Sequence, residues 1–194
     1  MNDQIVIENP LLLLSQWRNP VVEPLPIVQP PAGTTNGVPP DVYDAYRRGR
    51  DSACVDIMLA TRLKDGTPAV LLSKRKVNVC FGGMWWMYGG AVGSYQSMTD
   101  FVVERAKKEC GIRPDPSELV LVGVYRTCAP DIIGSTLQPC YAARVGLAEI
   151  QKYMGTDQAH ESIKLFTLRE LYQIPTAEQH WYPMRVASLV LQAL

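Results

Sequence analysis

Apolar and polar positions follow one pattern up to about residue 50 and another beyond it. From Cys54 onward, short apolar runs alternate with turn residues, and Asp65-Gly66 marks a hairpin between the first two runs. Strands are predicted over 54–60, 69–73, 85–88, 119–126, 137–145 and 162–166, and helical segments over about 97–110, 168–172 and 184–194. Because strands and helices alternate in a mixed order, we predict an α/β/α sandwich with a mixed sheet.

Residues 1–50 are predicted to form a proline-rich arm in front of a domain that spans residues 51–194. Eight of the fifteen prolines lie in this arm, and proline excludes long helices and central strands. Only a short polar helix is predicted there, over 41–50. The arm is either an extended linker or a segment that lies along a partner subunit through 5–7 or 21–28, because Trp17 is costly to leave in water. The second alternative implies a homodimer.

Charge and composition limit the expected partners. The chain has 19 basic and 19 acidic residues, so its formal net charge is zero, which argues against a nucleic-acid partner. Its five cysteines show no metal-binding spacing and are expected to be reduced thiols. The apolar run 11–14 is too short for a signal peptide or a membrane span, so we expect no membrane partner and a cytoplasmic location.

The stretch Gly90–Ile112 has the length and order of a known catalytic motif. Gly90, Glu109, Gly111 and Ile112 match the glycines, the last glutamate and the final apolar residue of the signature G-x5-E-x7-R-E-U-x-E-E-x-G-U. The chain therefore resembles the Nudix hydrolases, which act on nucleoside diphosphates linked to another group. Three further blocks resemble that family: Ala69-Val-Leu-Leu-Ser-Lys-Arg75, Trp85-x-x-Tyr88-Gly-Gly and His160–Leu171. The resemblance implies a Nudix-like α/β/α sandwich.

The motif departs from the family signature at the positions that bind metal. Gln96 replaces the first glutamate, Glu104-Arg105 reverses an Arg-Glu pair, and Lys108 replaces the penultimate glutamate. Arg105 and Glu109 are four residues apart on one helical face, so a cation stands where a metal-binding carboxylate is expected. A cluster of ions is therefore not expected. A single Mg²⁺ or Mn²⁺ ion held by Glu109 and a carbonyl at Gly90 is expected instead; the alternative is an ion pair between Glu109 and Arg105.

GDP-mannose mannosyl hydrolases have a similarly reduced motif, and the resemblance to them suggests further roles. Their histidine base corresponds to His160, although Ala159 replaces the glutamine that binds their metal. Glu161 is the rival base, because many pyrophosphate-cleaving relatives use a glutamate in this loop. Arg75 matches an arginine that contacts the diphosphate. The expected substrate-binding residues are Arg75, Gln96, Arg105 and Tyr88.

Two functions remain open at this point. The first is a hydrolase that uses one divalent ion on a nucleoside diphosphate-linked substrate such as a nucleotide sugar. The alternative is a catalytically impaired Nudix-fold protein that binds a nucleotide for a regulatory purpose, its metal site neutralised by Arg105 and Lys108. Four aromatic residues are either core residues or a stacking platform for a nucleobase: Phe81, Trp85, Trp86 and Tyr88.

Removing residues 1–40 tests the role of the arm. A proline-punctuated segment cannot bury Trp17 and its leucines within itself, so we expect these side chains to pack on the domain or across a homodimer. The truncated protein should then show a lower melting temperature or a changed mass in solution, measured by calorimetry and light scattering. Identical values for both proteins would identify the arm as a passive tail.

Overall fold

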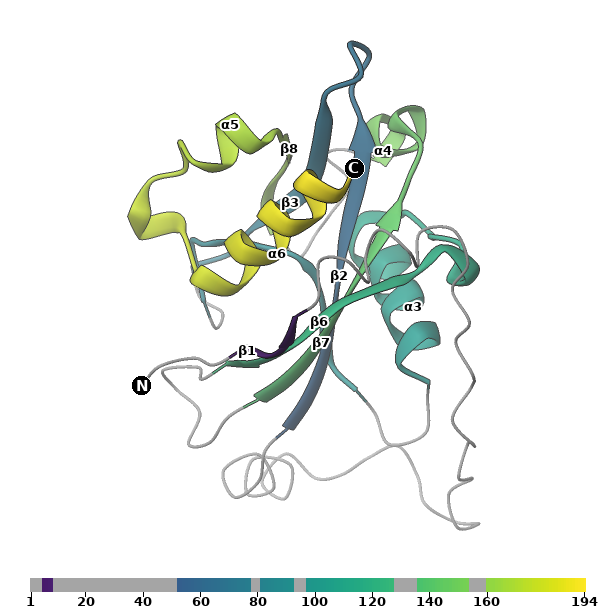
Figure 1. The fold of residues 1–194 in the computed structure, drawn as a ribbon, viewed down its shortest axis with the longest axis vertical. Coiled ribbons are helices and arrows are strands. Elements are labelled where there is room, and N and C mark those ends of the chain that lie inside the picture. Colours follow the sequence, from purple (N-terminus) through teal and green to yellow (C-terminus); the bar gives the residue numbers. More distant parts are fainter. Residues whose placement is uncertain (1–4, 9–51, 78–80, 93–96, 128–135, 154–159) are drawn as a thin grey trace.

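The computed structural model describes residues 5–8, 52–77, 81–92, 97–127, 136–153 and 160–194 (Figure 1). The strands are β1 (Ile5–Glu8), β2 (Ser52–Arg62), β3 (Pro68–Arg75), β4 (Trp85–Trp86), β5 (Tyr88–Ala91), β6 (Val120–Thr127), β7 (Thr136–Arg144) and β8 (His160–Phe166). The α-helices are α3 (Met98–Cys110), α4 (Leu147–Tyr153), α5 (Leu168–Leu171) and α6 (Trp181–Ala193), with short 3₁₀ turns at η1 (Pro116–Glu118) and η2 (Thr176–Glu178). Most of the arm, the helix predicted over 41–50, Gln96 and Ala159 lie outside the described residues.

The eight described strands form one mixed sheet. Its strands follow the order β1-β6-β7-β2-β3-β4, while β5 pairs with β2 and β8 pairs with β3. The pairing of β2 with β7 is parallel, and every other pairing is antiparallel. The mixed sheet that the sequence predicts is confirmed.

The long strands β2 and β3 pair at one end and separate at the other. Their pairing joins 59–62 to 68–71, beside the Asp65-Gly66 hairpin. Further along, β5 lies beside β2 and β4 lies beside β3, so the single strand predicted over 85–88 is two strands divided at Met87. Gly89 and Gly90 lie within β5, opposite Asp56 and Val55 of β2. The opening between β2 and β3 therefore positions the two glycines.

Each face of the sheet carries a helical layer, which confirms the predicted α/β/α sandwich (Figure 1). Alternate residues of β2 serve the two cores, as the two-residue period of a strand requires. Ile57 and Leu59 join the core with α3 and α4, whereas Met58 and Ala60 join the core with α6. No helix in the described parts of the chain is long and apolar enough to cross a membrane.

Helix α3 begins and ends where the sequence predicts. Ser97 is its N-cap residue, and the Ser97 side chain accepts a hydrogen bond from the backbone N–H of Asp100. Gly111 follows the helix with a φ of 76°, a left-handed conformation that glycine adopts without steric cost. These two caps fix the length of the helix that presents Arg105 and Glu109 to the sheet.

Besides the divided strand over 85–91, three other elements differ from the prediction. Helix α4 was not predicted, because its seven residues bury only Ile150 and so show no periodic apolar stripe. Helix α6 begins at Trp181 instead of Met184, because the His180 side chain caps it by accepting a hydrogen bond from the Tyr182 backbone N–H. Strand β1, within the predicted arm, pairs antiparallel with β6 of the same chain.

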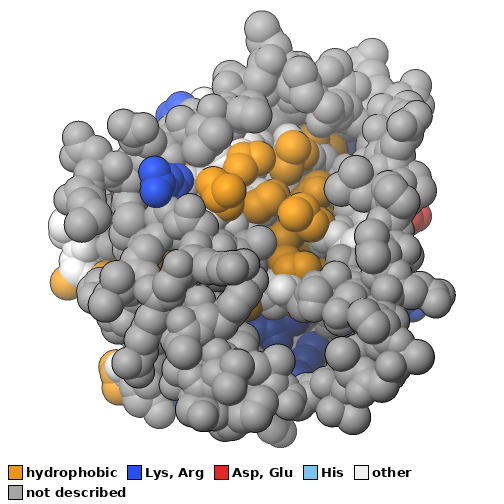
Figure 2. All heavy atoms as spheres, turned by 90° about the horizontal axis from the view of Figure 1, so that it is seen from below, with side chains coloured by type: hydrophobic (Ala, Val, Ile, Leu, Met, Phe, Trp, Pro, Cys, Tyr) orange, Lys and Arg blue, Asp and Glu red, His pale blue; other side chains and the backbone are white. Residues whose placement is uncertain are grey.

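One end of the sheet presents hydrophobic side chains. Figure 2 views the molecule from the end at which β2 and β7 begin, and shows described hydrophobic side chains gathered near the centre, with basic side chains deeper beside them. Leu137, the second residue of β7, is 43% exposed. The chain enters β2 from the arm at this end of the sheet.

Replacing Gly89 with alanine tests the close approach of β5 to β2. A Cβ on Gly89 would lie 2.1 Å from Oδ1 of Asp56 and 2.3 Å from the Val55 carbonyl oxygen, so the strands would have to separate. We expect the free energy of unfolding to fall by about 1–3 kcal/mol or more, measured by urea denaturation. Gly146→Ala is the matched control, because a Cβ there meets no atom within 4 Å. Equal stability of the two variants would contradict the described packing of β5.

Candidate functional site

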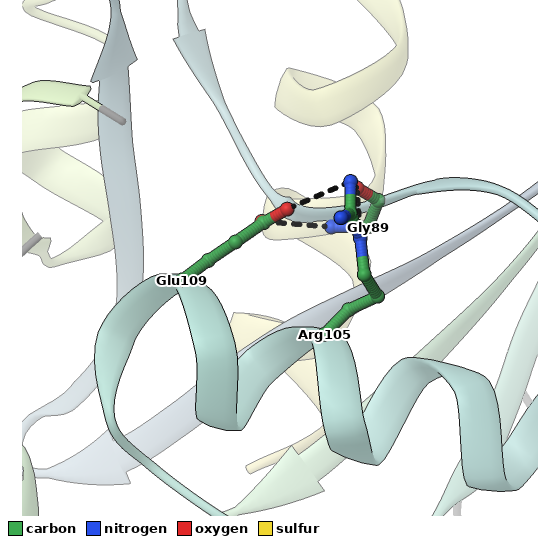
Figure 3. Close-up of polar contacts among 3 residues, drawn as sticks. All are labelled: Gly89, Arg105 and Glu109. Carbon is green, nitrogen blue, oxygen red and sulfur yellow. Dashed lines mark hydrogen bonds and ion pairs between the residues drawn. The ribbon is translucent and has the colours of Figure 1, made fainter. Parts of the chain in front are cut away.

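Arg105 and Glu109 of α3 both form hydrogen bonds with the backbone of Gly89 (Figure 3). Nη2 of Arg105 lies 3.0 Å from Oε1 of Glu109, and the two side chains are four residues apart on the helix. Nε and Nη2 of Arg105 also donate to the Gly89 carbonyl oxygen at 3.3 and 3.1 Å. The Gly89 N–H in turn donates to Oε2 of Glu109 at 3.3 Å. Both backbone groups of one glycine are therefore bonded to one ion pair.

The side chains of this ion pair are partly exposed to solvent. The Glu109 side chain is 13% exposed and the Arg105 side chain 33% exposed. A Cβ on Gly90 would lie only 2.7 Å from Nη2 of Arg105, so glycine is needed at this position for the guanidinium to approach. The hydrogen bonds and the ion pair of Arg105 described above use only its Nε and Nη2. Neither N–H group of Nη1 takes part in them. The guanidinium thus keeps donors for a ligand.

A second group of predicted site residues lies beside the first. Arg75 at the end of β3 pairs in register with His160 at the start of β8. The His160 ring lies edge-on to the Tyr88 ring, with centroids 5.9 Å apart, and Tyr88 directly precedes Gly89. The fold therefore brings His160, Arg75 and Tyr88 to the strand ends next to the Arg105–Glu109 pair.

The other predicted positions lie at the edge of this group or outside it. Glu161 is exposed at the start of β8. Glu104, which stands at the position of the arginine in the family signature, is exposed as well and forms an ion pair with Arg113 at 3.0 Å. Lys108 is exposed on α3. Gln96 lies outside the described residues.

Asp56 lies behind the Gly89 segment, and sequence reasoning missed it. It is 2% exposed in β2, opposite Gly89, and the hydroxyl of Tyr182 on α6 donates to its Oδ2 at 2.9 Å. One signal could have found it, because Asp56 is the single charged residue in the otherwise apolar run 53–60. A buried carboxyl group is uncommon without a specific partner.

Burial raises the pKa of the Asp56 carboxyl to about 7. The hydrogen bond from Tyr182 and the positive charges of Arg75 and Arg105 oppose this rise, whereas the negative charge of Glu109 adds to it. Burial also raises the pKa of the neighbouring Cys140 thiol and of the Tyr182 hydroxyl. Asp56 is thus electrostatically linked to the ion pair on the far side of Gly89.

Several solved structures with a similar arrangement of strands and helices are Nudix proteins. The Nudix domain of Shewanella oneidensis NrtR, crystallised with ADP ribose, matches with a TM-score of 0.58 and 22% identity, over 77% of this chain and 94% of that one. A MutT/nudix family protein from Listeria innocua matches with a TM-score of 0.58 and 23% identity, over 75% of this chain and 96% of that one. The protein has the Nudix fold.

The likeness to these solved structures establishes the fold of the protein and not its activity. A longer NrtR chain, crystallised with a 27mer DNA, matches with a TM-score of 0.55 and 22% identity over 70% of this chain, and the match spans 59% of that NrtR chain. No model of a known protein family matches the sequence, and no curated protein matches it. Because one fold hosts many functions, the Nudix fold by itself assigns no activity.

A divalent ion does not fit the donors of this Nudix fold in the described arrangement. The expected ligands were the Glu109 carboxylate and a carbonyl at Gly90, but the Arg105 guanidinium already bonds Glu109 and the adjacent Gly89 carbonyl. Mg²⁺ and Mn²⁺ require several oxygen ligands and are repelled by a neighbouring cation. Among the described residues, no three His, Cys, Asp or Glu side chains are grouped so as to hold a metal ion. A cation supplied by the chain is already bonded to one expected ligand, Glu109, and to the residue before the other, Gly90.

The pH dependence of stability tests the environment of Asp56. The folded pKa of about 7 lies above the ordinary value, so the folded protein binds more protons than the unfolded chain between the two pKa values. This group therefore lowers the free energy of unfolding as pH rises from about 4 to 7, with the full cost present above pH 7.

Asp56→Asn should remove that cost, so the variant should gain stability relative to the wild type as pH rises through this window. The measurement is the difference between the two melting temperatures at several pH values from 5 to 8.5. Glu104→Gln, an exposed carboxylate on α3, is the control and should show no such trend. A difference that stays constant with pH would contradict the raised pKa.

Proposed function

We propose that this protein binds a nucleoside diphosphate-type ligand at the Gly89–Gly90 segment, with the Arg105 guanidinium in place of a divalent ion. One observation carries the proposal: Arg105 bonds both Glu109, an expected metal ligand, and the carbonyl of Gly89, which directly precedes the other expected ligand, Gly90. Glu109 then acts as the positioning residue of a phosphate-binding arginine. The protein is a binding or regulatory module in this proposal.

The chemistry of the cationic groups supports a diphosphate. Guanidinium groups form paired, charge-assisted hydrogen bonds with phosphate oxygens, and such bonds are stronger than neutral ones. Arg105 is held by two partners before a ligand arrives, so little side-chain entropy is lost on binding. Arg75 adds a second guanidinium at the adjacent strand end. The ADP ribose bound to the NrtR Nudix domain is a ligand of this chemical class.

Nucleotide sugar hydrolysis is the second candidate function, and the position of His160 favours it. His160 lies beside Arg75 and against Tyr88, the residue that precedes Gly89, and in this second function it serves as the base for a bound substrate. Glu161 is the other candidate base, but it is exposed. For one Mg²⁺ or Mn²⁺ ion to bind Glu109 and Gly90, Arg105 must first leave both partners. Hydrolysis therefore predicts a metal-dependent rearrangement that simple binding does not need.

The remaining expectations on partners and location stay predictions. A homodimer through the N-terminal arm, the boundary at residue 50, the absence of a nucleic-acid partner and the cytoplasmic location rest on the sequence. The DNA in the longer NrtR structure belongs to a chain of which the match spans 59%. Zero net charge supports a small anionic ligand over DNA in this chain.

The ligand and metal requirements are tested together by calorimetric titration of ADP-ribose. We expect the same affinity in EDTA and in millimolar Mn²⁺, because the guanidinium supplies the positive charge. Arg105→Ala should weaken binding by about 10- to 100-fold, the loss of one or two charge-assisted hydrogen bonds. Lys107→Ala, which removes the same charge from an exposed position of α3, is the matched control and should change little.

The opposite result would support hydrolysis. In that case binding would require Mn²⁺, and Glu109→Gln would abolish steady turnover. Such results would show that an ion displaces Arg105 from Glu109. His160→Gln would then be expected to lower kcat by about 10²–10⁴-fold with ligand affinity retained. Absence of binding under both conditions would overturn the proposed function.

A further inference from the structure

Three aromatic rings form a compact stack at the end of β3 and β4. The Phe81 ring lies parallel to the Trp86 ring, with centroids 4.5 Å apart and planes at 16°. The His180 ring, at the N-cap of α6, contacts both, at 4.9 Å from Phe81 and 5.1 Å from Trp86. Trp86 is 3% exposed, whereas Phe81 is only half-buried. Phe81 and His180, which are both half-buried, therefore lie outside Trp86 in the stack.

The backbone of Phe81 is strained. Among the described residues, Phe81 is the single non-glycine residue with a positive φ, at 56°. A bulky residue in this region raises the free energy of the backbone and persists where the surroundings force it, often at functional sites. The surroundings are tight here, because Gly83 donates to the Arg75 carbonyl at 2.9 Å and Arg75 donates to the Met84 carbonyl at 3.0 Å. The loop thus holds a large ring at the surface at a cost in free energy.

This stack adjoins the diphosphate site. The guanidinium carbon of Arg75 lies 5.7 Å from the centroid of the Trp86 ring. Trp86 precedes Gly89 by three residues of nearly extended chain, a distance of roughly 10 Å. Arg75 also acts on the charge of Asp56, directly behind Gly89. Arg75 therefore stands between the aromatic stack and the ion pair of α3.

We propose that the outer face of Phe81 is the stacking platform for the nucleobase of the ligand, whose diphosphate lies at Arg75 and Arg105. This inference rests on the proposed function and adds the part of the ligand that it recognises. Every nucleobase has a flat face that stacks on an aromatic ring, so the platform requires no particular base. The ribose of a nucleotide provides the spacing between the base and its phosphates. Trp86 and His180 act as positioning residues that fix the plane of Phe81.

The position of the rings favours a base over other flat or apolar groups. Phe81 stacks on Trp86, and the Arg75 guanidinium lies over the Trp86 ring, so a ligand whose phosphate binds Arg75 can carry its base toward Phe81. A purely apolar ligand would make no use of Arg75. A sugar without a base would leave the Phe81 face uncovered. The combination of ring and cation therefore identifies a nucleotide.

The test compares ADP-ribose with inorganic pyrophosphate as ligands of the whole protein. Phe81→Leu removes the ring, and we expect it to weaken ADP-ribose binding by about 5- to 150-fold, the value of one base–aromatic stack. Pyrophosphate has no base, so its affinity should not change. Phe81→Tyr restores the ring and should restore ADP-ribose affinity. Leucine and tyrosine impose the same backbone strain at this φ, so the comparison isolates the ring.

Two measurements keep the test decisive. Tyr172→Leu removes an aromatic residue that is 70% exposed and contacts Ser188 instead of the stack, and it should bind both ligands normally. Pyrophosphate binding by Phe81→Leu reports that the variant is folded at its site. Equal effects of Phe81→Leu on both ligands, or no effect on either, overturn the inference alone. A wild type that binds neither ligand overturns the proposed function and this inference with it.

Discussion

The bonds from the Arg105 guanidinium to Glu109 and to the Gly89 carbonyl join the helix of the motif to the sheet. They connect α3 to β5 through one side chain. Gly90 must lack a side chain because the guanidinium lies where a Cβ would be. Glu109 is bonded twice, to Arg105 and to the Gly89 N–H, so its charge is already compensated. A strong permanent cation beside a half-buried carboxylate leaves little attraction for a second cation.

The sequence predicted the architecture well because its signals were local. Apolar strands bounded by turns, a Ser97 cap and a Gly111 terminus each depend on a few neighbouring residues. The misses involved distant partners or weak periodicity. Helix α4 buries one side chain, and the division of residues 85–91 into β4 and β5 arises because β2 and β3 separate and each takes a different neighbour. Such a separation leaves no mark in a seven-residue window.

The candidate site was predictable where the motif placed residues on one helix. The four-residue spacing of Arg105 and Glu109 indicated either an ion pair or a metal ligand, and the geometry shows the ion pair. The neighbourhood of His160, Arg75 and Tyr88 followed from matching separate blocks of the chain to the Nudix signature. Asp56 escaped because its partner Tyr182 lies 126 residues away, and no local pattern records that contact. Phe81 was one of four aromatic candidates, but its positive φ was not predicted, because the composition of a segment does not specify its backbone angles.

Gly89 has a wider consequence for the two halves of the sandwich. A sheet normally separates its two cores, since side chains of one face do not meet those of the other. At Gly89 that separation fails, because Asp56, which accepts a hydrogen bond from Tyr182 of α6, lies against the glycine while Arg105 and Glu109 of α3 bond its backbone. At this point charged groups on one face of the sheet act on a carboxyl group of the other face. A change in the packing of the C-terminal helix can therefore alter the field at the site without any residue of the motif being replaced.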